Sequence, residues 1–320
     1  MFHTIITHPG QAHRDDFMAC AIALGLCRDA TIHRREPVLS ELDDPKVLVL
    51  DIGGRHEPEL GNFDHHQLPR DAEAACALSL LAEAMGWSDA LSETRWYGNT
   101  KVMDSKGPRA LAALIGCDPK IVFANPSPVE GALLELFQGM EAIPYYAWLH
   151  TAMAEIGHAV LSNAKKLLER RKWLEENARV RFAGVEILVV ESTDTDGVSA
   201  FRDAEHPDAA ICVSHDDRDG GWSLYRFDDD PRVDFSLVAG DSRIKFAHTN
   251  GFIAKTKERL GLDEVLGICR NALVLTGGTI CPECGSRDPR KSAKACLLCE
   301  DTLKSFVEEA EIRVGWDPTP

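Results

Sequence analysis

The chain has 320 residues, which is too long for one ordinary core and predicts two domains with an appendage. Hydrophobic residues make up 44% and charged residues 27%, as in globular proteins, and no apolar run approaches the roughly 18–20 residues that span a bilayer. The formal net charge of −16 argues against nonspecific binding to duplex DNA, because the phosphate backbone repels such a chain. A nucleic-acid ligand would have to be short or held by a local basic patch.

The first part of the chain alternates between strand and helix patterns. Residues 2–7 are rich in β-branched and apolar types and predict a buried strand, and residues 16–28 predict a helix. Residues 47–50 form a short apolar run that ends at Asp51, as in a parallel strand buried on both faces. Residues 72–85 again predict a helix. This alternation predicts an α/β domain with a doubly wound, mostly parallel sheet.

The second part predicts a smaller α/β domain after a long helix. The helical pattern covers residues 144–179 and is followed by strand candidates and one further helix, at 185–190, 209–214, 222–227, 243–247 and 256–269. We therefore expect four parts: residues 1–178, 179–275, 276–303, and a C-terminal helix or tail at 304–320.

Four short segments of the first part carry His and Asp residues that suit metal ions. They are residues 7–16, Asp51, residues 63–66 and Asp104, each expected at a strand end or in a turn. Ligands are often gathered at the carboxyl ends of strands in an open α/β sheet. Imidazole nitrogens and carboxylate oxygens suit Mn²⁺, Mg²⁺ or Zn²⁺, and a carboxylate can bridge two ions.

These segments predict a dinuclear centre. One ion would be held by His8, His13 and Asp51. The other would be held by Asp15, Asp51, His65 and Asp104, so that Asp51 bridges the two ions. Such a pair of ions lowers the pKa of a water and clamps phosphoryl oxygens during in-line attack. The competing interpretation is that each His or Asp is a solvated surface residue or a loop cap.

The same residues resemble a known family. Asp64-His65-His66 is similar to the signature of the DHH phosphoesterase superfamily, and the match is closer to the melanocyte-proliferating-gene type of exonuclease. That branch also has segments like those at 7–15, 51–54, 64–67 and 248–253. The resemblance touches most of residues 1–270.

The resemblance implies a catalytic DHH domain, a smaller substrate-binding domain, a bimetallic centre, and cleavage of RNA or short oligonucleotides. It places His66 beside the transferred phosphate, where the ring could hydrogen-bond an oxygen or protonate the leaving group. Two departures concern Asp16, where the family has Glu, and Ala254-Lys255-Thr256, where the family has two glycines and a Lys. Glycines there would let the backbone approach a phosphate closely.

Cationic residues of the second part are candidates for binding the substrate. They are Arg243, Lys245, His248 and Lys255, of which the first two alternate along a predicted strand and would share one face. The alternative is an ordinary amphipathic strand with solvated charges.

Two Cys-x-x-Cys pairs predict a structural zinc site. Cys281, Cys284, Cys296 and Cys299 have the spacing of a zinc ribbon, in which four thiolates hold one tetrahedral Zn²⁺ and leave no open position for chemistry. Ten cysteines are too few for a disulfide scaffold in a chain of this length, so a cytoplasmic protein is expected. No secretory signal or membrane partner is expected, and a homo-oligomer stays open.

Three functions follow from these patterns. The leading one is a Mn²⁺- or Mg²⁺-dependent phosphodiesterase of the exonuclease type, with Asp51 and His66 as catalytic candidates. The second is hydrolysis of a small phosphorylated molecule, such as pyrophosphate or a cyclic dinucleotide. The third is a catalytically inactive adaptor that binds nucleic acid or protein.

Overall fold

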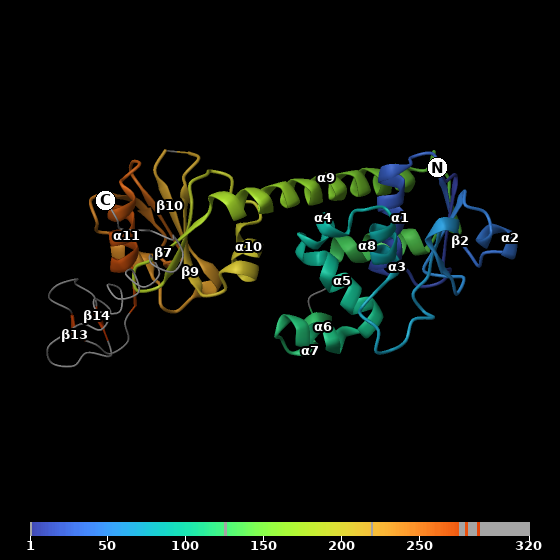
Figure 1. The fold of residues 1–320 in the computed structure, drawn as a ribbon, viewed down its shortest axis with the longest axis horizontal. Coiled ribbons are helices and arrows are strands. Elements are labelled where there is room, and N and C mark those ends of the chain that lie inside the picture. The colour runs from blue at the N-terminus through green and yellow to red at the C-terminus, as the bar shows by residue number, and fades with distance from the viewer. Residues whose placement is uncertain (1, 125–126, 219, 275–278, 281–286, 289–320) are drawn as a thin grey trace, which may run out of the picture. The chain divides into compact units, whose positions relative to one another are not determined.

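The computed structural model describes residues 2–124, 127–218, 220–274, 279–280 and 287–288 (Figure 1). The chain divides into two compact units, residues 1–169 and 170–320. Helix α9, Trp148–Asn177, starts in the first unit and ends in the second. The predicted organisation into four parts stays a prediction, and the four cysteines of the predicted zinc site lie outside the described residues.

The first unit contains a six-stranded sheet in the order β4-β5-β3-β1-β2-β6. The four inner strands run parallel: β1 Thr4–Thr7, β2 Thr31–Arg34, β3 Val47–Leu50 and β5 Asn62–Phe63. The two edge strands are antiparallel to their neighbours: β4 His56–Glu57 pairs with β5, and β6 Ala142–Ile143 pairs with β2. The predicted mostly parallel α/β sheet is therefore confirmed.

Both faces of this sheet are covered, which explains why its central strands are apolar without interruption. Ile5 and Leu50 belong to the large cluster that includes residues of α1 and α3, whereas Ile6 and Val49 pack with Leu42 of α2. Figure 1 shows α2 on the opposite side of the sheet from α1 and α3. Burial of each such side chain contributes roughly 1.5–3 kcal/mol, so the strands are fixed in place by packing.

The predicted helices of the first unit are present, with different ends. The structure also contains helices α4 to α8, between residues 88 and 138, which were not predicted. The observed bounds are α1 Arg14–Leu26, α2 Leu39–Leu42, η1 Pro58–Leu60, α3 Ala77–Ala84, α4 Ser88–Ser92, α5 Arg95–Lys106, α6 Pro108–Ile115, α7 Pro119–Ala124 and α8 Pro128–Gln138. The helix predicted over 72–85 begins only at Ala77. The helix starts after Cys76, whose amide donates a hydrogen bond to the Ser79 hydroxyl, and in the loop before it Lys106 donates to the carbonyl oxygen of Ala72.

The second unit contains a six-stranded sheet in the order β11-β12-β10-β9-β8-β7, in which β8 and β9 run parallel and the other pairs antiparallel. Its strands and helices are β7 Arg179–Phe182, β8 Glu186–Val190, α10 Val198–Glu205, β9 Ala209–His215, β10 Trp222–Arg226, η2 Phe227–Asp229, η3 Phe235–Val238, β11 Ile244–Ala247, β12 Ile253–Thr256 and α11 Leu262–Asn271. A further short pair joins β13 Thr279–Ile280 to β14 Arg287–Asp288.

One predicted helix of the second unit is wrong at its start. The helix predicted over 256–269 starts only at Leu262, and Thr256 is instead the last residue of strand β12, Ile253–Thr256. The strand is held between β10 and β11, and the Thr256 hydroxyl accepts a hydrogen bond from the Trp222 amide at 2.7 Å. Pairing with two neighbours therefore decides the local structure there.

None of the helices in the described part of the chain combines the length and apolar character that crossing a bilayer requires.

Candidate metal centre

Three neighbouring strands deliver most of the candidate ligands to one edge of the first sheet. His8 follows β1, Asp51 follows β3, and His65 follows β5 by two residues. The order β5-β3-β1 makes these strand ends adjacent. The predicted position of these ligands at carboxyl ends of parallel strands is therefore what the structure shows.

Helices supply the remaining candidates. His13 caps the start of α1 and Asp15 lies in its first turn. Asp104 lies inside α5, two residues before the end of that helix, so its predicted place at a strand end or in a turn is wrong. The helical position still serves the site, because α5 brings the Asp104 carboxylate to within 3.0 Å of His65 Nε2.

The backbone at Asp51 has an unusual conformation. Asp51 has φ 61°, in the left-handed region that non-glycine residues seldom adopt, and Gly53 and Gly54 also have positive φ. A short polar side chain tolerates this conformation better than most. The turn holds the Asp51 carboxylate at the end of β3 and lets the Gly54 amide donate a 2.6 Å hydrogen bond to Asp64.

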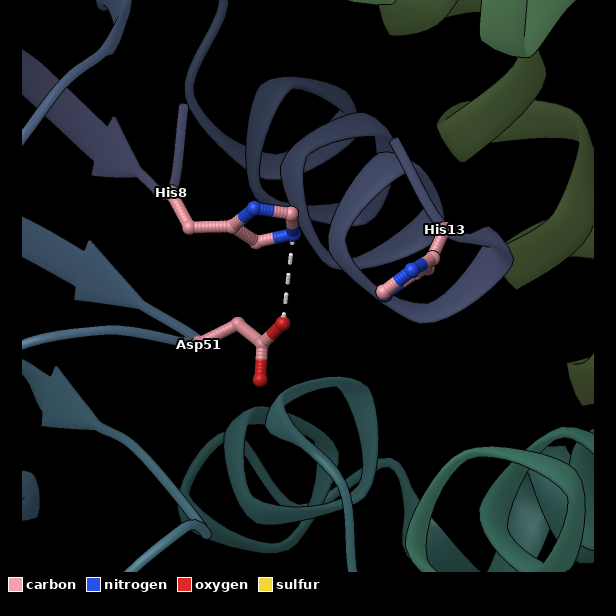
Figure 2. A group of neighbouring side chains, drawn as sticks. All are labelled: His8, His13 and Asp51. Atoms are coloured by element: carbon pink, nitrogen blue, oxygen red, sulfur yellow. Dashed lines mark ion pairs between the residues drawn. The ribbon is translucent and has the colours of Figure 1, made fainter. Parts of the chain in front are cut away.

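Asp51 joins two groups of potential ligands. Its Oδ2 lies 3.5 Å from His8 Nε2, a contact that Figure 2 shows with His13 at the start of the neighbouring helix. Its Oδ1 lies 3.0 Å from His65 Nε2. Besides Asp51, His65 and His66, two groups have ligand atoms that all lie within 4.8 Å of one another: His8, His13 and Asp51, and Asp15, Asp51, His65 and Asp104. These are the two predicted ligand sets, and Asp51 belongs to both.

Several buried oxygens at this centre make no hydrogen bond in the described part of the chain, although Oδ2 of Asp16 lies 3.3 Å from His8 Nε2. Both carboxylate oxygens of Asp15 and Oδ2 of Asp16 make no hydrogen bond there. Asp15 is 1% exposed and Asp16 is fully buried, so water does not replace the missing partners at their surface. A buried, unpaired carboxylate is costly. The donor set therefore fits bound cations, which would supply the missing charge.

The pKa values at the centre show the same excess of negative charge. Burial, together with the charges of Asp51 and Asp104, raises the pKa of Asp15 to about 9. Burial alone would lower the pKa of His65, but its contacts with the carboxylates of Asp104 and Asp51 raise it to about 10. Burial and the neighbouring carboxylates disfavour ionisation of all these groups at once.

His66 is held differently from His65. Its side chain is 65% exposed, and its Nδ1 lies 2.7 Å from Oδ1 of Asp64, which also accepts a hydrogen bond from the His66 amide. Burial alone would raise the pKa of Asp64, but these contacts outweigh burial and lower it. Because Nδ1 is engaged, Nε2 is the ring nitrogen that can exchange a proton with a substrate.

Two residues beneath the centre were not among the predicted site residues. Asp16 accepts a 2.8 Å hydrogen bond from the His13 amide, and its Oδ2 lies 3.3 Å from His8 Nε2 and 3.7 Å from the Arg34 guanidinium. Arg34 is buried and donates to the carbonyl oxygen of Gly10. The departure from the family pattern at Asp16 pointed to this position, whereas nothing in the sequence indicated Arg34.

Most residues predicted to bind substrate in the second unit already form ion pairs or hydrogen bonds with neighbouring residues. Arg243 lies before β11, and its guanidinium is 2.7 Å from Asp241; Lys255 pairs with Asp216 at 2.5 Å. A register shift in β11 interrupts the alternation expected for Arg243 and Lys245. His248 accepts a 3.1 Å hydrogen bond from the Asn250 amide. Their role in binding stays a prediction.

The family comparison supports the resemblance for the N-terminal part of the chain. Residues 4–75 match a family model named MYG1_exonuc and described as uncharacterised protein family UPF0160. The resemblance read from the sequence is confirmed there, in the segment that contains His8, Asp51 and His65. The matched segment ends before Asp104 and before the second unit.

The comparisons with curated proteins and with solved structures add little to the family match. A comparison with curated proteins finds no match. Among solved structures, the chain is similar to RecJ from Thermus thermophilus, which was crystallised in complex with Mn²⁺, with 15% identity and a TM-score of 0.26. The similarity covers 84% of this chain and 51% of the RecJ chain, so this chain spans about half the length of that protein.

Proposed function

We propose that this chain is a metal-dependent phosphoesterase of the exonuclease type, which hydrolyses phosphodiester bonds of RNA or short oligonucleotides. The observation that carries the proposal is the position of Asp51, whose two oxygens face different groups of nitrogen and oxygen ligands. A shared carboxylate is the usual bridge between two catalytic ions about 3.5–4 Å apart. The exonuclease name of the matched family supports the same activity.

The ligand types favour Mn²⁺ or Mg²⁺. One ion would be held by His8, His13 and Asp51, and the other by Asp15, Asp51, His65 and Asp104. Carboxylate oxygens dominate the second group, and imidazole nitrogens take part in both. When bound, the ions would lower the pKa of a water and neutralise charge on the phosphoryl oxygens.

The protein's own groups would position the reacting atoms. Asp51 would fix the separation of the two cation sites, because its backbone conformation and its burial leave the carboxylate little freedom. His66, oriented by Asp64 through Nδ1, would hydrogen-bond a phosphoryl oxygen or give its Nε2 proton to the leaving oxygen. Its 65% exposure leaves the ring accessible from the cavity that it lines.

A second function shares this centre. The cavity at the ligands has a volume of about 610 Å³, and all of its lining residues belong to the first unit. Such a cavity suits a compact substrate, so hydrolysis of a small phosphorylated molecule such as pyrophosphate is the alternative that the geometry favours. A catalytically inactive adaptor is the third outcome of the test below.

The test is incubation of the protein, loaded with Mn²⁺, with a 5′-labelled short RNA and with DNA of the same sequence. We expect either a ladder of shortened products or released labelled mononucleotide from the wild type, and neither from His65→Gln, which removes one proposed ligand at similar size. His56→Gln is the matched control, because His56 lies in the edge strand β4 and belongs to neither ligand group.

Each other outcome has a meaning. Phosphate released from pyrophosphate, with RNA and DNA intact, would replace the proposal by the small-molecule hydrolase. Binding of oligonucleotides without any turnover would leave the adaptor. Equal cleavage by the wild type and His65→Gln would place catalysis away from this centre. The four-cysteine zinc site stays a separate prediction, which metal analysis of the full chain would test.

A further inference from the structure

A cationic loop borders the metal centre within the first unit. The cavity that contains His8, Asp51 and His66 is also lined by Arg70 and Lys106. Arg70 lies in the loop between β5 and α3, and Lys106 is the last residue of α5. Because every lining residue belongs to one compact unit, this arrangement does not depend on the second unit.

Lys106 fastens the loop to the helix that carries a proposed metal ligand. Its Nζ donates hydrogen bonds to the carbonyl oxygens of Arg70, at 2.7 Å, and of Ala72, at 2.6 Å. Asp104 lies two residues earlier in the same helix. The ammonium therefore ties the backbone at Arg70 to the element that positions Asp104. A long loop held in this way presents its side chains at a defined distance from the metal centre.

The Arg70 guanidinium differs from three other guanidinium groups of the first unit. Arg14 pairs with Glu130, Arg35 with Glu41 and Arg55 with Asp43. Arg70 is exposed, and its side chain makes no hydrogen bond or ion pair with any described residue. A planar, always charged fork without a protein partner, at the rim of a cavity, suits a ligand with paired oxygens such as a phosphate.

The rest of the cavity explains why such a cation would be needed. Glu36 and Glu73 also line it, and they would repel any phosphate that lies beyond the metal centre. In the second unit, two of the cations predicted to bind phosphate are already paired with Asp241 and Asp216. A fixed cation beside the metal centre would offset this repulsion.

We propose that Arg70 binds a second phosphate of the substrate, next to the one that reacts, and that Lys106 is its positioning residue. This inference rests on the proposed phosphoesterase function and narrows its substrates to molecules that carry a phosphate on each side of a nucleoside. Such substrates are terminally phosphorylated or longer oligonucleotides. A dinucleotide without a terminal phosphate lacks the group that Arg70 binds.

The test measures binding by calorimetry to the Mn²⁺-loaded full chain. The ligands are three dinucleotides with a slowly hydrolysed phosphorothioate as the internal linkage: ApA, pApA and ApAp. We expect the wild type to bind pApA or ApAp about 10- to 100-fold more tightly than ApA, the range for hydrogen bonds to a charged group. Arg70→Ala should lose this preference and keep its affinity for ApA, and Arg70→Lys should keep part of it.

Two further variants separate the roles. Arg109→Ala removes the same charge from an exposed position at the start of α6 that does not line the cavity, and it should keep the wild-type preference. Lys106→Met should reduce the preference and leave the Mn²⁺ stoichiometry unchanged, since it releases the loop and removes no proposed ligand.

A wild type that binds all three dinucleotides equally would overturn the inference, as would Arg70→Ala with the wild-type preference. Failure of the proposed function looks different, because it would appear as intact unmodified dinucleotides after incubation with Mn²⁺. The binding preference is measured without turnover. The result therefore tests the role of Arg70 whether or not the protein hydrolyses these ligands.

Discussion

The proposed metal ligands of the first unit and the predicted phosphate-binding cations of the second unit lie in different electrostatic surroundings. In the first, Asp15, Asp16 and Asp51 are buried at one edge of the sheet, and oxygens of Asp15 and Asp16 make no hydrogen bond in the described residues. In the second, the cations Arg243 and Lys255 each have an acidic partner within the same unit. The first unit is therefore electrostatically incomplete at its candidate site, whereas these cations of the second unit are neutralised.

This difference separates a candidate site from a charged surface. A cluster of like charges out of water is unfavourable unless another group compensates it, which supports the proposed cation site. A cation that is already paired with a carboxylate gives no such indication of a ligand.

The largest effect is expected from Asp51→Asn. Asn keeps the size of the side chain and tolerates the left-handed conformation at φ 61°, but it removes the charge of the proposed bridge. We expect the rate of Mn²⁺-dependent RNA cleavage to fall on the order of 10³-fold or more. Asp29→Asn, in an exposed turn, is the control and should act as the wild type. Comparable rates for both variants would exclude a bridging role for Asp51.

Mn²⁺ should stabilise the protein more at high pH than at low pH. In the metal-free protein, the raised pKa values of Asp15, about 9, and His65, about 10, mean that the folded state binds protons more strongly than the unfolded state. The contribution of His65 is complete below about pH 6.5 and is lost as pH rises towards 10; that of Asp15 is lost between about pH 4 and 9. Bound Mn²⁺ would replace those protons.

Thermal unfolding in EDTA and in excess Mn²⁺ checks this prediction. At a free concentration of 100 times the dissociation constant, one bound ion adds about 2.7 kcal/mol to the free energy of unfolding. We expect the shift in melting temperature caused by Mn²⁺ to be larger near pH 8 than near pH 6, where protons compete with the metal. A shift that is absent, or that is larger at the lower pH, would contradict an electrostatically incomplete site.

Asp16→Ala should destabilise the first unit by about 2 kcal/mol. The substitution removes the acceptor for the His13 amide at the start of α1 and the acidic neighbour of buried Arg34. Urea unfolding with and without Mn²⁺ measures the change, and Asp16→Asn, which keeps an acceptor oxygen, should lose less. If Asp16→Ala is as stable as the wild type, repulsion among the carboxylates outweighs these two contacts.

The smallest effect is expected in the second unit. Lys255→Met removes an ammonium already neutralised by Asp216, so KM for short RNA should change by less than about threefold. Lys257→Met, two positions further along the chain, is a matched control, since its Nζ contacts the Ser242 carbonyl oxygen at 2.5 Å. A rise in KM of about tenfold for Lys255→Met alone would restore the prediction that this lysine binds substrate.

Local sequence patterns predicted two strands of the first unit, β1 and β3, and the types of its candidate ligands. The apolar run at 47–50 predicted β3, and Asp51 at its end follows from the change of residue type. His8 and His65 were found in the same way, because both lie in short motifs next to strands. The two ligand groups correspond to these motifs, since carboxyl ends of neighbouring parallel strands meet at one edge.

Only the tertiary structure decided which charges are compensated and which loops are held. Arg34 lies in β2 and reaches Asp16 through space, while Lys106 reaches back from the end of α5 to the carbonyl oxygen of Arg70. The sequence shows the residue types but not these contacts, because they join segments that are far apart in the chain. Hydrogen bonds and ion pairs depend on distances of a few ångströms, and packing of the core fixes those distances.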